Sequence, residues 1–245
     1  MPRLFLGLIL ALTSVWCAQA ADLTDQIQKR YDTLQSFRGF FLQKLTNASS
    51  REVQERLGTI TFARPRFIRW ETTSPENELL IIGQDTVWEY FPAEETVYRY
   101  SVEQVLSSKT MIRFLSGEAN LKDDFIVQDL GEDGEFRHLK IIPREPEPNL
   151  VEGELWVRPG QDMLEKIKLV DFFGNVNELE LTGIEIDVEV SDKEFTLDPP
   201  KGTEVIEGLV RRKNAQHRLG AEPGGEHHGQ HKRERQIAPG DDVIA

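Results

Sequence analysis

Short stretches that alternate apolar and polar residues, separated by turn residues, follow one another through most of this chain. The clearest examples are residues 58–70 and 81–90. Alternation with a period of two sends successive side chains to opposite faces of a strand, so the pattern predicts consecutive strands of an antiparallel sheet. The large side chains predicted to share one face are Ile60, Phe62, Trp70, Trp88 and Tyr90.

Two segments carry helical spacing instead. Residues 22–36 predict an amphipathic helix, and residues 102–116 predict two short helices that end near Gly117. The apolar positions of the first helix are Leu23, Ile27, Tyr31 and Leu34, and those of the second segment include Met111, Ile112 and Leu115. Helices this few and this short cannot cover the outside of a large sheet, but they can cover one opening.

We expect about 10–11 strands in all. The predicted strands are residues 39–45, 53–62, 67–72, 78–82, 86–91, 96–100, 125–130, 136–142, 151–158, 163–171 and 175–186, and a last extended piece covers 195–205. Short strands at this spacing predict a barrel or a strongly curved sheet. Large side chains on strands usually form a core. A barrel of this size nevertheless encloses more space than side chains fill, which favours an apolar cavity under the helices.

The N-terminus has the pattern of a secretory signal peptide. Arg3 precedes an apolar core over residues 4–15, and cleavage is expected between Ala20 and Ala21. The alternative is an uncleaved anchor, but the apolar run is shorter than the about 20 residues that a span needs. A lipid-modified Cys17 is disfavoured because the bulky Trp16 precedes it. We therefore expect an exported domain over residues 21–208, held together without disulfides.

Charge is distributed unevenly along the chain. Of 29 basic and 42 acidic residues, residues 1–20 hold one basic residue, and residues 209–245 hold seven basic and five acidic ones. Residues 21–208 therefore hold 21 basic and 37 acidic residues, a net charge of −16. Such a domain repels nucleic acid and anionic lipid head groups. Residues 209–245 lack core-forming residues and are predicted to be a disordered tail.

Four of the five histidines lie in this tail, at His217, His227, His228 and His231. The spacing of 227 and 231 permits a metal site, but a solvated tail is the favoured interpretation. His138 is expected on a strand face without a chemical role. We expect no metal and no cofactor.

An enzyme is the less favoured class of function. The domain has no cysteine, no G-x-S-x-G motif and one histidine, so a catalytic triad is not available. Carboxylates are abundant, so their number alone does not exclude a glycosidase-like pair. Most carboxylates, however, alternate with apolar residues, as they do on the solvated face of a sheet.

Arg64 stands out among apolar positions at the end of a predicted strand. It follows Ile60 and Phe62 on the inward side, where an arginine is costly unless its donors are satisfied. Carbonyl groups at the end of a short helix would satisfy them. The equal alternative is that Arg64 lies at the strand end and reaches water.

Five motifs in order resemble the LolA family of periplasmic outer-membrane lipoprotein carriers. They are residues 37–43 (F-x-x-F-F-L-Q), 58–70 with Arg64-Pro65, 87–92 (V-W-E-Y-F-P), 114–117 (F-L-S-G) and 195–202 (F-T-L-D-P-P-K-G). The resemblance implies an incomplete antiparallel barrel with a lid of helices over an apolar cavity. It implies that Arg64 bonds to the lid and helps to keep it shut. The implied cavity residues are Ile60, Phe62, Ile68, Trp70, Leu80, Ile82, Trp88, Tyr90, Met111, Ile112 and Leu115, and the implied lid residues of the first helix are Leu23, Ile27, Tyr31 and Leu34.

The resemblance also implies partners. Acylated lipoproteins would be received from an inner-membrane ABC transporter and delivered to an outer-membrane receptor lipoprotein. We expect a monomer in the periplasm that does not bind nucleic acid. Two alternatives remain from the sequence: a carrier of glycolipid or another amphiphile, and a domain that senses lipoproteins.

Overall fold

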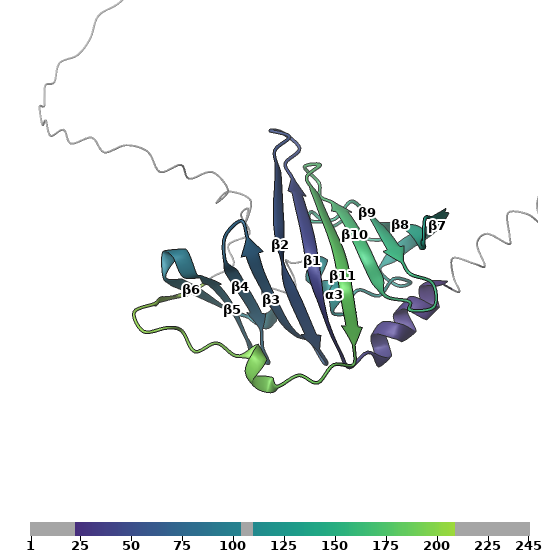
Figure 1. Ribbon diagram of the computed structural model, residues 1–245. Helices are drawn as coiled ribbons and strands as arrows, with labels where there is room; N and C mark the ends of the chain where they lie inside the picture. The colour runs from purple at the N-terminus through teal and green to yellow at the C-terminus, as the bar shows by residue number, and fades with distance from the viewer. Residues whose placement is uncertain (1–22, 104–109, 209–245) are drawn as a thin grey trace, which may run out of the picture. The chain divides into compact units, whose positions relative to one another are not determined.

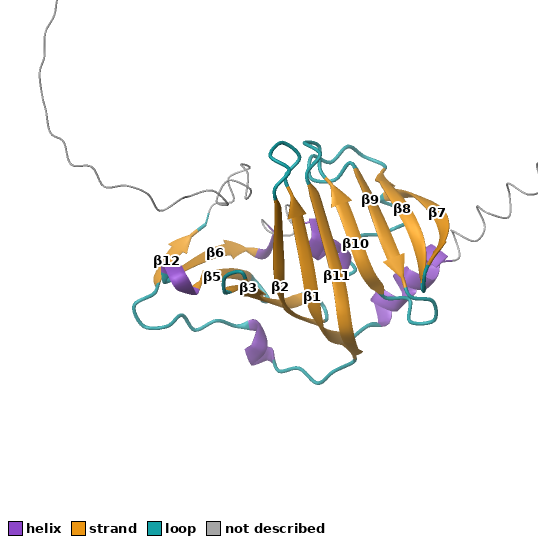
Figure 2. Cartoon of the chain, turned by 45° about the horizontal axis from the view of Figure 1, so that its top comes forward, coloured by secondary structure: helices purple, strands orange, loops and turns teal. Residues whose placement is uncertain are grey.

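A computed structural model describes residues 23–103 and 110–208. The predicted signal peptide, most of the first predicted helix of the 102–116 segment and the predicted tail with its histidines lie outside the described residues. Most of the described chain forms one sheet of twelve strands, shown in Figures 1 and 2. The strands are β1 (Ser36–Thr46), β2 (Val53–Ala63), β3 (Phe67–Ser74), β4 (Glu78–Ile82), β5 (Thr86–Phe91), β6 (Thr96–Ser101), β7 (Phe125–Asp133), β8 (Phe136–Pro143), β9 (Glu152–Val157), β10 (Leu164–Val170), β11 (Val176–Ile186) and β12 (Glu204–Glu207).

The sheet is an open, strongly twisted antiparallel sheet rather than a closed barrel. The strand order is β12-β6-β5-β4-β3-β2-β1-β11-β10-β9-β8-β7, so β12 and β7 form its two edges. The first and last long strands, β1 and β11, pair at its centre, and two antiparallel meanders extend from them. This confirms the predicted curved, incomplete barrel. The one exception to antiparallel pairing within the described sheet is β12, which lies parallel to β6.

Helices cover the inner face of the sheet. Residues 23–33 form a helix, and α3 (Thr110–Leu115) lies behind the sheet in the view of Figure 1. Two short 3-10 helices, η1 (Pro92–Glu94) and η2 (Asp192–Phe195), lie outside this cover. No helix within residues 23–103 and 110–208 has the length and apolar character that a bilayer crossing requires.

Two apolar clusters divide the two faces of the sheet. The large inner cluster joins residues of the strands to the helices, and it includes Ile27, Phe62 and Leu115. The smaller outer cluster consists of Ala63, Ile81 and Phe195, with partly buried side chains packed against it. Both Ile81 and Ile82 are therefore fully buried, on opposite faces of β4.

The segment that follows β11 buries the outer face of β3 to β5. It leaves β11 at Asp187, crosses the sheet through η2 and ends at β12 on the far edge (Figure 2). We call residues 187–203 the strap. Phe195 of the strap stacks on Phe67 of β3, with ring centroids 5.4 Å apart. Because the strap covers their outer face, β3 to β5 carry apolar residues on both faces.

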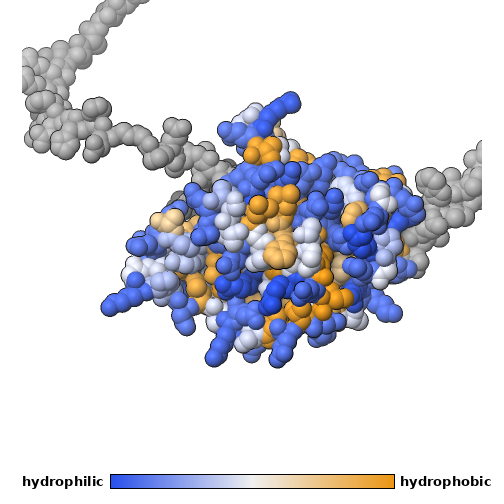
Figure 3. All heavy atoms as spheres, viewed as in Figure 1, coloured by the Kyte–Doolittle hydropathy of each residue, from blue (hydrophilic) through white to orange (hydrophobic). Residues whose placement is uncertain are grey.

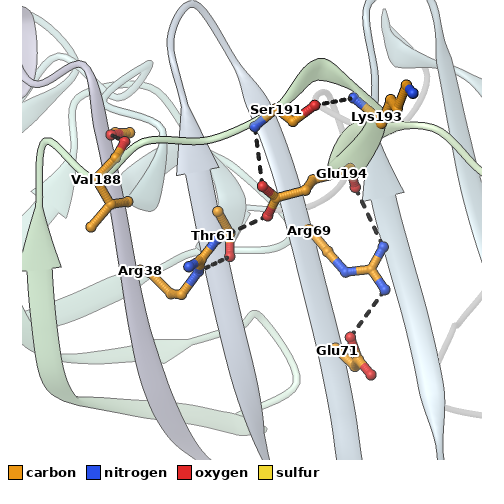
Figure 4. A network of polar contacts seen from close by, with 9 residues as sticks. Arg38, Thr61, Arg69, Glu71, Val188, Ser191, Lys193 and Glu194 are labelled. Carbon is orange, nitrogen blue, oxygen red and sulfur yellow. Dashed lines mark hydrogen bonds and ion pairs between the residues drawn. The ribbon is translucent and has the colours of Figure 1, made fainter.

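Polar contacts fix the strap to β1 and β3, as Figure 4 shows. The Arg38 guanidinium donates to the Glu194 carboxylate at 2.9 Å, and Arg69 donates to the Glu194 carbonyl oxygen at 3.3 Å. Ser191 and Glu194 form a capping box at the start of η2. The Ser36 hydroxyl donates to the Val188 carbonyl oxygen at 2.6 Å. The strap is therefore held at both its apolar and its polar positions.

The prediction for Trp88 and Tyr90 is wrong. Trp88 pairs with Ile81 in the β4–β5 register, and it packs against the outer cluster. Tyr90 pairs with Leu79, which packs against that same cluster. Directly paired residues share a face, so both aromatic side chains lie on the outer side. Val87 takes the inner position instead, because alternation along β5 places it opposite Ile82.

Candidate functional site

The inner face of the sheet and the helices over it form the candidate site. Of the residues predicted to line a cavity, nine lie in the inner cluster or pack against it: Ile60, Phe62, Ile68, Trp70, Leu80, Ile82, Met111, Ile112 and Leu115. The four predicted lid residues of the first helix, Leu23, Ile27, Tyr31 and Leu34, also meet this cluster. The structure thus joins strand and helix residues that lie far apart in the sequence.

Aromatic side chains make up the centre of the inner face. Phe41 of β1 tilts against Trp70 of β3 with ring centroids 4.5 Å apart, and Phe37 stacks on Phe62 at 5.5 Å. Gly58 of β2 permits the first contact, because a Cβ there would lie 2.8 Å from the Phe41 ring and 1.9 Å from a backbone oxygen. The β2–β3 register shifts at this point, which bends the sheet around the site.

A row of polar side chains bounds the apolar part of the inner face near the β1–β2 turn. Gln43 is buried and donates to the side chain of Asn177 at 3.0 Å. Arg56 lies opposite Gln43 in the β1–β2 register and forms an ion pair with Glu78. Burial lowers the pKa of Arg56, and the charge of Glu89 opposes that effect. An apolar ligand would therefore occupy the region between this row and the helix of residues 23–33.

Arg64 connects the sheet to the end of that helix. Its Nε donates to the Leu34 carbonyl oxygen at 3.0 Å, and its Nη2 donates to the Tyr31 carbonyl oxygen at 2.6 Å. Arg64 follows the last residue of β2 and is exposed. Both interpretations of the sequence therefore apply: the side chain lies at a strand end in contact with water, and helix carbonyls accept its donors.

Further contacts join this helix to the chain after α3. The Leu121 amide donates to the Gln28 side chain at 3.4 Å, and Lys122 forms an ion pair with Asp25. Tyr31 is buried between the two segments, and burial raises the pKa of its phenol, which keeps it neutral. Its hydroxyl lies near the backbone of Leu164, but no described group meets it in hydrogen-bonding geometry. The helix is thus held by apolar packing and few polar bonds.

Side chains of the helices fill the inner face in this closed arrangement. α3 buries Met111, Ile112, Phe114 and Leu115 against it. A pocket between the first helix, α3 and Leu164 measures about 10 Å³, which is room for at most one water molecule. The residues predicted to line a cavity pack against one another here, and among the described residues an apolar ligand could enter between the first helix and α3 only if these helices moved.

The structure places other sequence candidates away from this site. His138 lies on a strand, stacks on Trp156 at 4.3 Å and has its Nε2 2.7 Å from a Glu154 carboxylate oxygen. Within the described ranges, no group of three histidine, cysteine or acidic residues could hold a metal ion.

Sequence reasoning placed Phe195 in a motif but missed that the strap covers the outer face of the sheet, although a signal was present. The uninterrupted apolar run at residues 79–82 is typical of a strand buried on both faces.

Comparisons with known proteins place the chain among lipoprotein carriers. The family model described as "Outer membrane lipoprotein carrier protein LolA" matches residues 32–198. An outer-membrane lipoprotein carrier protein of Vibrio parahaemolyticus is 26% identical over 204 residues, which cover 83% of this chain and 94% of the relative. One from Methylococcus capsulatus is 28% identical over 211 residues and covers 84% and 99%. These relatives are named as carriers, not as enzymes.

One solved structure shares the fold. The crystal structure of an uncharacterized conserved protein from Thermus thermophilus matches with a TM-score of 0.52 and 13% identity, covering 78% of this chain and 99% of that one. This likeness supports the architecture alone.

Proposed function

Because this chain belongs to the LolA family of outer-membrane lipoprotein carrier proteins, we propose that it carries lipoproteins through the periplasm. The acyl chains of the cargo would lie between the inner face of the sheet and the helices at residues 23–33 and 110–115. We call these helices the lid. The observation that supports this most is the large apolar inner cluster, to which both the sheet and the helices contribute buried side chains.

The physical basis is an exchange of apolar contacts. Burying an acyl chain is worth about 0.8 kcal/mol per CH₂ group, so a lipoprotein cannot cross water unaided. An open lid would lose its own apolar contacts and the Arg64 bonds, but the inner face would gain acyl contacts. The free energy of the closed lid therefore reduces the net affinity for cargo and keeps later transfer favourable. The unpartnered Tyr31 hydroxyl lowers the cost of opening, since a buried hydroxyl without a partner costs about 1–3 kcal/mol.

In this proposal, cargo is loaded by an inner-membrane ABC transporter and unloaded to an outer-membrane receptor lipoprotein. Cleavage between Ala20 and Ala21 would release the carrier into the periplasm. Arg64 would hold the lid shut whenever no acyl chain occupies the site.

Release of lipoproteins from spheroplasts tests the proposal. Purified residues 21–245 are added to spheroplasts of a Gram-negative cell, and the supernatant is probed for soluble lipoproteins. We expect release in a one-to-one complex. If the protein releases no lipoprotein but holds a glycolipid or another amphiphile, that lipid becomes the proposed cargo. A protein that neither releases lipoproteins nor holds any lipid would contradict the carrier function altogether.

A further inference from the structure

The turn between β10 and β11 exposes two adjacent phenylalanines. Phe172 and Phe173 have 72% and 70% of their surface exposed. Their rings meet edge to face with centroids 5.7 Å apart. Phenylalanine is among the residues most often buried. Two such rings side by side on a protruding turn therefore indicate an interaction site rather than a contribution to the core.

Hydrogen bonds fix the backbone that carries this pair. One carboxylate oxygen of Asp171 accepts from the amides of Phe173 and Asn175, at 2.8 and 2.9 Å. Gly174 has φ 81°, a conformation that glycine adopts at low cost. The amide of Phe172 donates to the Pro148 carbonyl oxygen at 3.1 Å. The rings are thus presented on an ordered turn, and binding through them would order little additional backbone.

A second turn lies beside the first. The side-chain oxygen of Asn175 accepts from the amide of Ala48 in the β1–β2 turn at 3.0 Å. Figure 1 shows both turns at the same end of the sheet. We call residues 47–52 and 171–175 the tip. The tip contains one basic and two acidic residues, whereas residues 21–208 carry a net charge of −16. The carboxylate of Asp171 is already bonded to the turn.

We propose that the tip inserts Phe172 and Phe173 into the interfacial region of a zwitterionic phospholipid bilayer. Aromatic side chains favour this region, where an apolar group enters the boundary between head groups and acyl chains. The low charge of the tip lets it approach a neutral surface, while the acidic domain as a whole is repelled by anionic lipids. Two side chains form a small anchor, so the contact would be weak and reversible.

The position of the tip suits a protein whose lid must move. Arg64 and the end of the first helix lie at the other end of β2 from the β1–β2 turn. Contact through the tip therefore leaves the first helix of the lid unobstructed. Such contact would bring the carrier to a membrane between transfer steps, and this role rests on the proposed function. Binding to the bilayer does not depend on that function.

Co-sedimentation with vesicles tests the proposal. Residues 21–245 are mixed with sucrose-loaded phosphatidylcholine vesicles, and the wild type is compared with a Phe172→Ser, Phe173→Ser double variant. Phe40→Ser is the matched control, because Phe40 is 61% exposed but lies on β1, away from the tip. We expect the double variant to bind roughly tenfold or more weakly, since two apolar side chains are lost. Phe40→Ser should bind like the wild type, and added salt should not weaken binding to these neutral vesicles.

Three results would overturn the proposal: no binding by the wild type, equal binding by the double variant, or an equal loss in Phe40→Ser. A different outcome is that the wild type does not bind vesicles and the double variant no longer releases lipoproteins from spheroplasts. The tip would then bind an apolar pocket of a protein partner instead of a bilayer. Circular dichroism confirms that each variant is folded. Because the vesicles contain no lipoprotein, failure of this proposal is distinguishable from failure of the carrier function.

Discussion

Gly117 lies against Tyr31 so closely that a Cβ on Gly117 would stand 2.8 Å from the Cβ of Tyr31. Gly117 ends the turn after α3, and Tyr31 lies on the first helix. The φ of Gly117 is 72°, a region that other residues adopt only at a cost. This close contact lets the chain after α3 pack against the first helix, and glycine permits it without strain.

Gly117→Ala is expected to destabilise the lid. The backbone conformation costs about 1 kcal/mol for alanine, and the contact with Tyr31 adds to that cost. Gly160→Ala is the matched control, because Gly160 also has a positive φ but no atom lies within 4 Å of its Cβ position. Urea unfolding should show a larger loss for Gly117→Ala. Equal losses would show that the contact with Tyr31 contributes nothing.

Tyr31→Phe is expected to stabilise the closed protein. The change removes a buried hydroxyl that lacks a partner and keeps the ring, which packs in the inner cluster. We expect the free energy of unfolding to rise by about 1 kcal/mol and cargo loading to become slower. Tyr90→Phe serves as control, since Tyr90 is only half-buried on the outer face. A less stable Tyr31→Phe variant would show that the hydroxyl is satisfied in solution.

Arg64→Leu is expected to loosen the lid with little effect on global stability. Arg64 itself is exposed and its two bonds are part-buried, so the loss should be about 1 kcal/mol. Hydrogen exchange of the last turn of residues 23–33 should accelerate, and unloading of bound lipoprotein should slow. Arg66→Leu is the control, because Arg66 approaches the Gln84 carbonyl oxygen at 3.4 Å, away from the helix. Wild-type exchange and unloading rates in Arg64→Leu would argue against its role in holding the lid.

Phe195→Ala is expected to release the strap from the sheet. Phe195 is 3% exposed and covers Ile81 and Trp88. Removing a buried phenyl ring costs about 3–5 kcal/mol. Acrylamide should quench more of the tryptophan fluorescence, because Trp88 would meet water. Phe173→Ala removes an exposed ring, so it should change neither the free energy of unfolding nor the quenching. Unchanged quenching in Phe195→Ala would mean that the strap stays bound without its anchor.

The outer surface of the central strands shows why apolar residues alone do not identify an interface. Figure 3, in the view of Figure 1, shows apolar surface bordered by polar residues on this face. Phe40 and Leu57 are exposed there. They lie on strands β1 and β2, whereas the rings of Phe172 and Phe173 meet on one ordered turn. The vesicle experiment compares exposed phenylalanines on that turn with Phe40, which is exposed on a strand.

Local sequence patterns determined the elements of this fold with good accuracy. The strands predicted over residues 78–82 and 86–91 have the bounds of β4 and β5 in the structure. The turn residues around Gly83 end one strand and start the next, and the alternating pattern is local. The spacing of Ile27, Tyr31 and Leu34 likewise predicts the buried side of the first helix. A period of two or 3.6 is a property of consecutive residues, so the sequence contains it directly.

Tertiary structure decided which face each strand buries and what covers the other. Nothing in residues 86–91 distinguishes Val87 from Trp88 as the inward residue, because a strand buried on both faces loses its polar side. Pairing with β4 and packing of the strap decided that Val87 points inward and Trp88 outward. Phe195 of the strap lies more than 100 positions later in the sequence. The same holds for Arg64: the sequence left open whether its donors meet helix carbonyls or water, and only the packing of the first helix supplied the carbonyls of Tyr31 and Leu34. Contacts between distant segments depend on the free energy of the whole fold, and no local period encodes them.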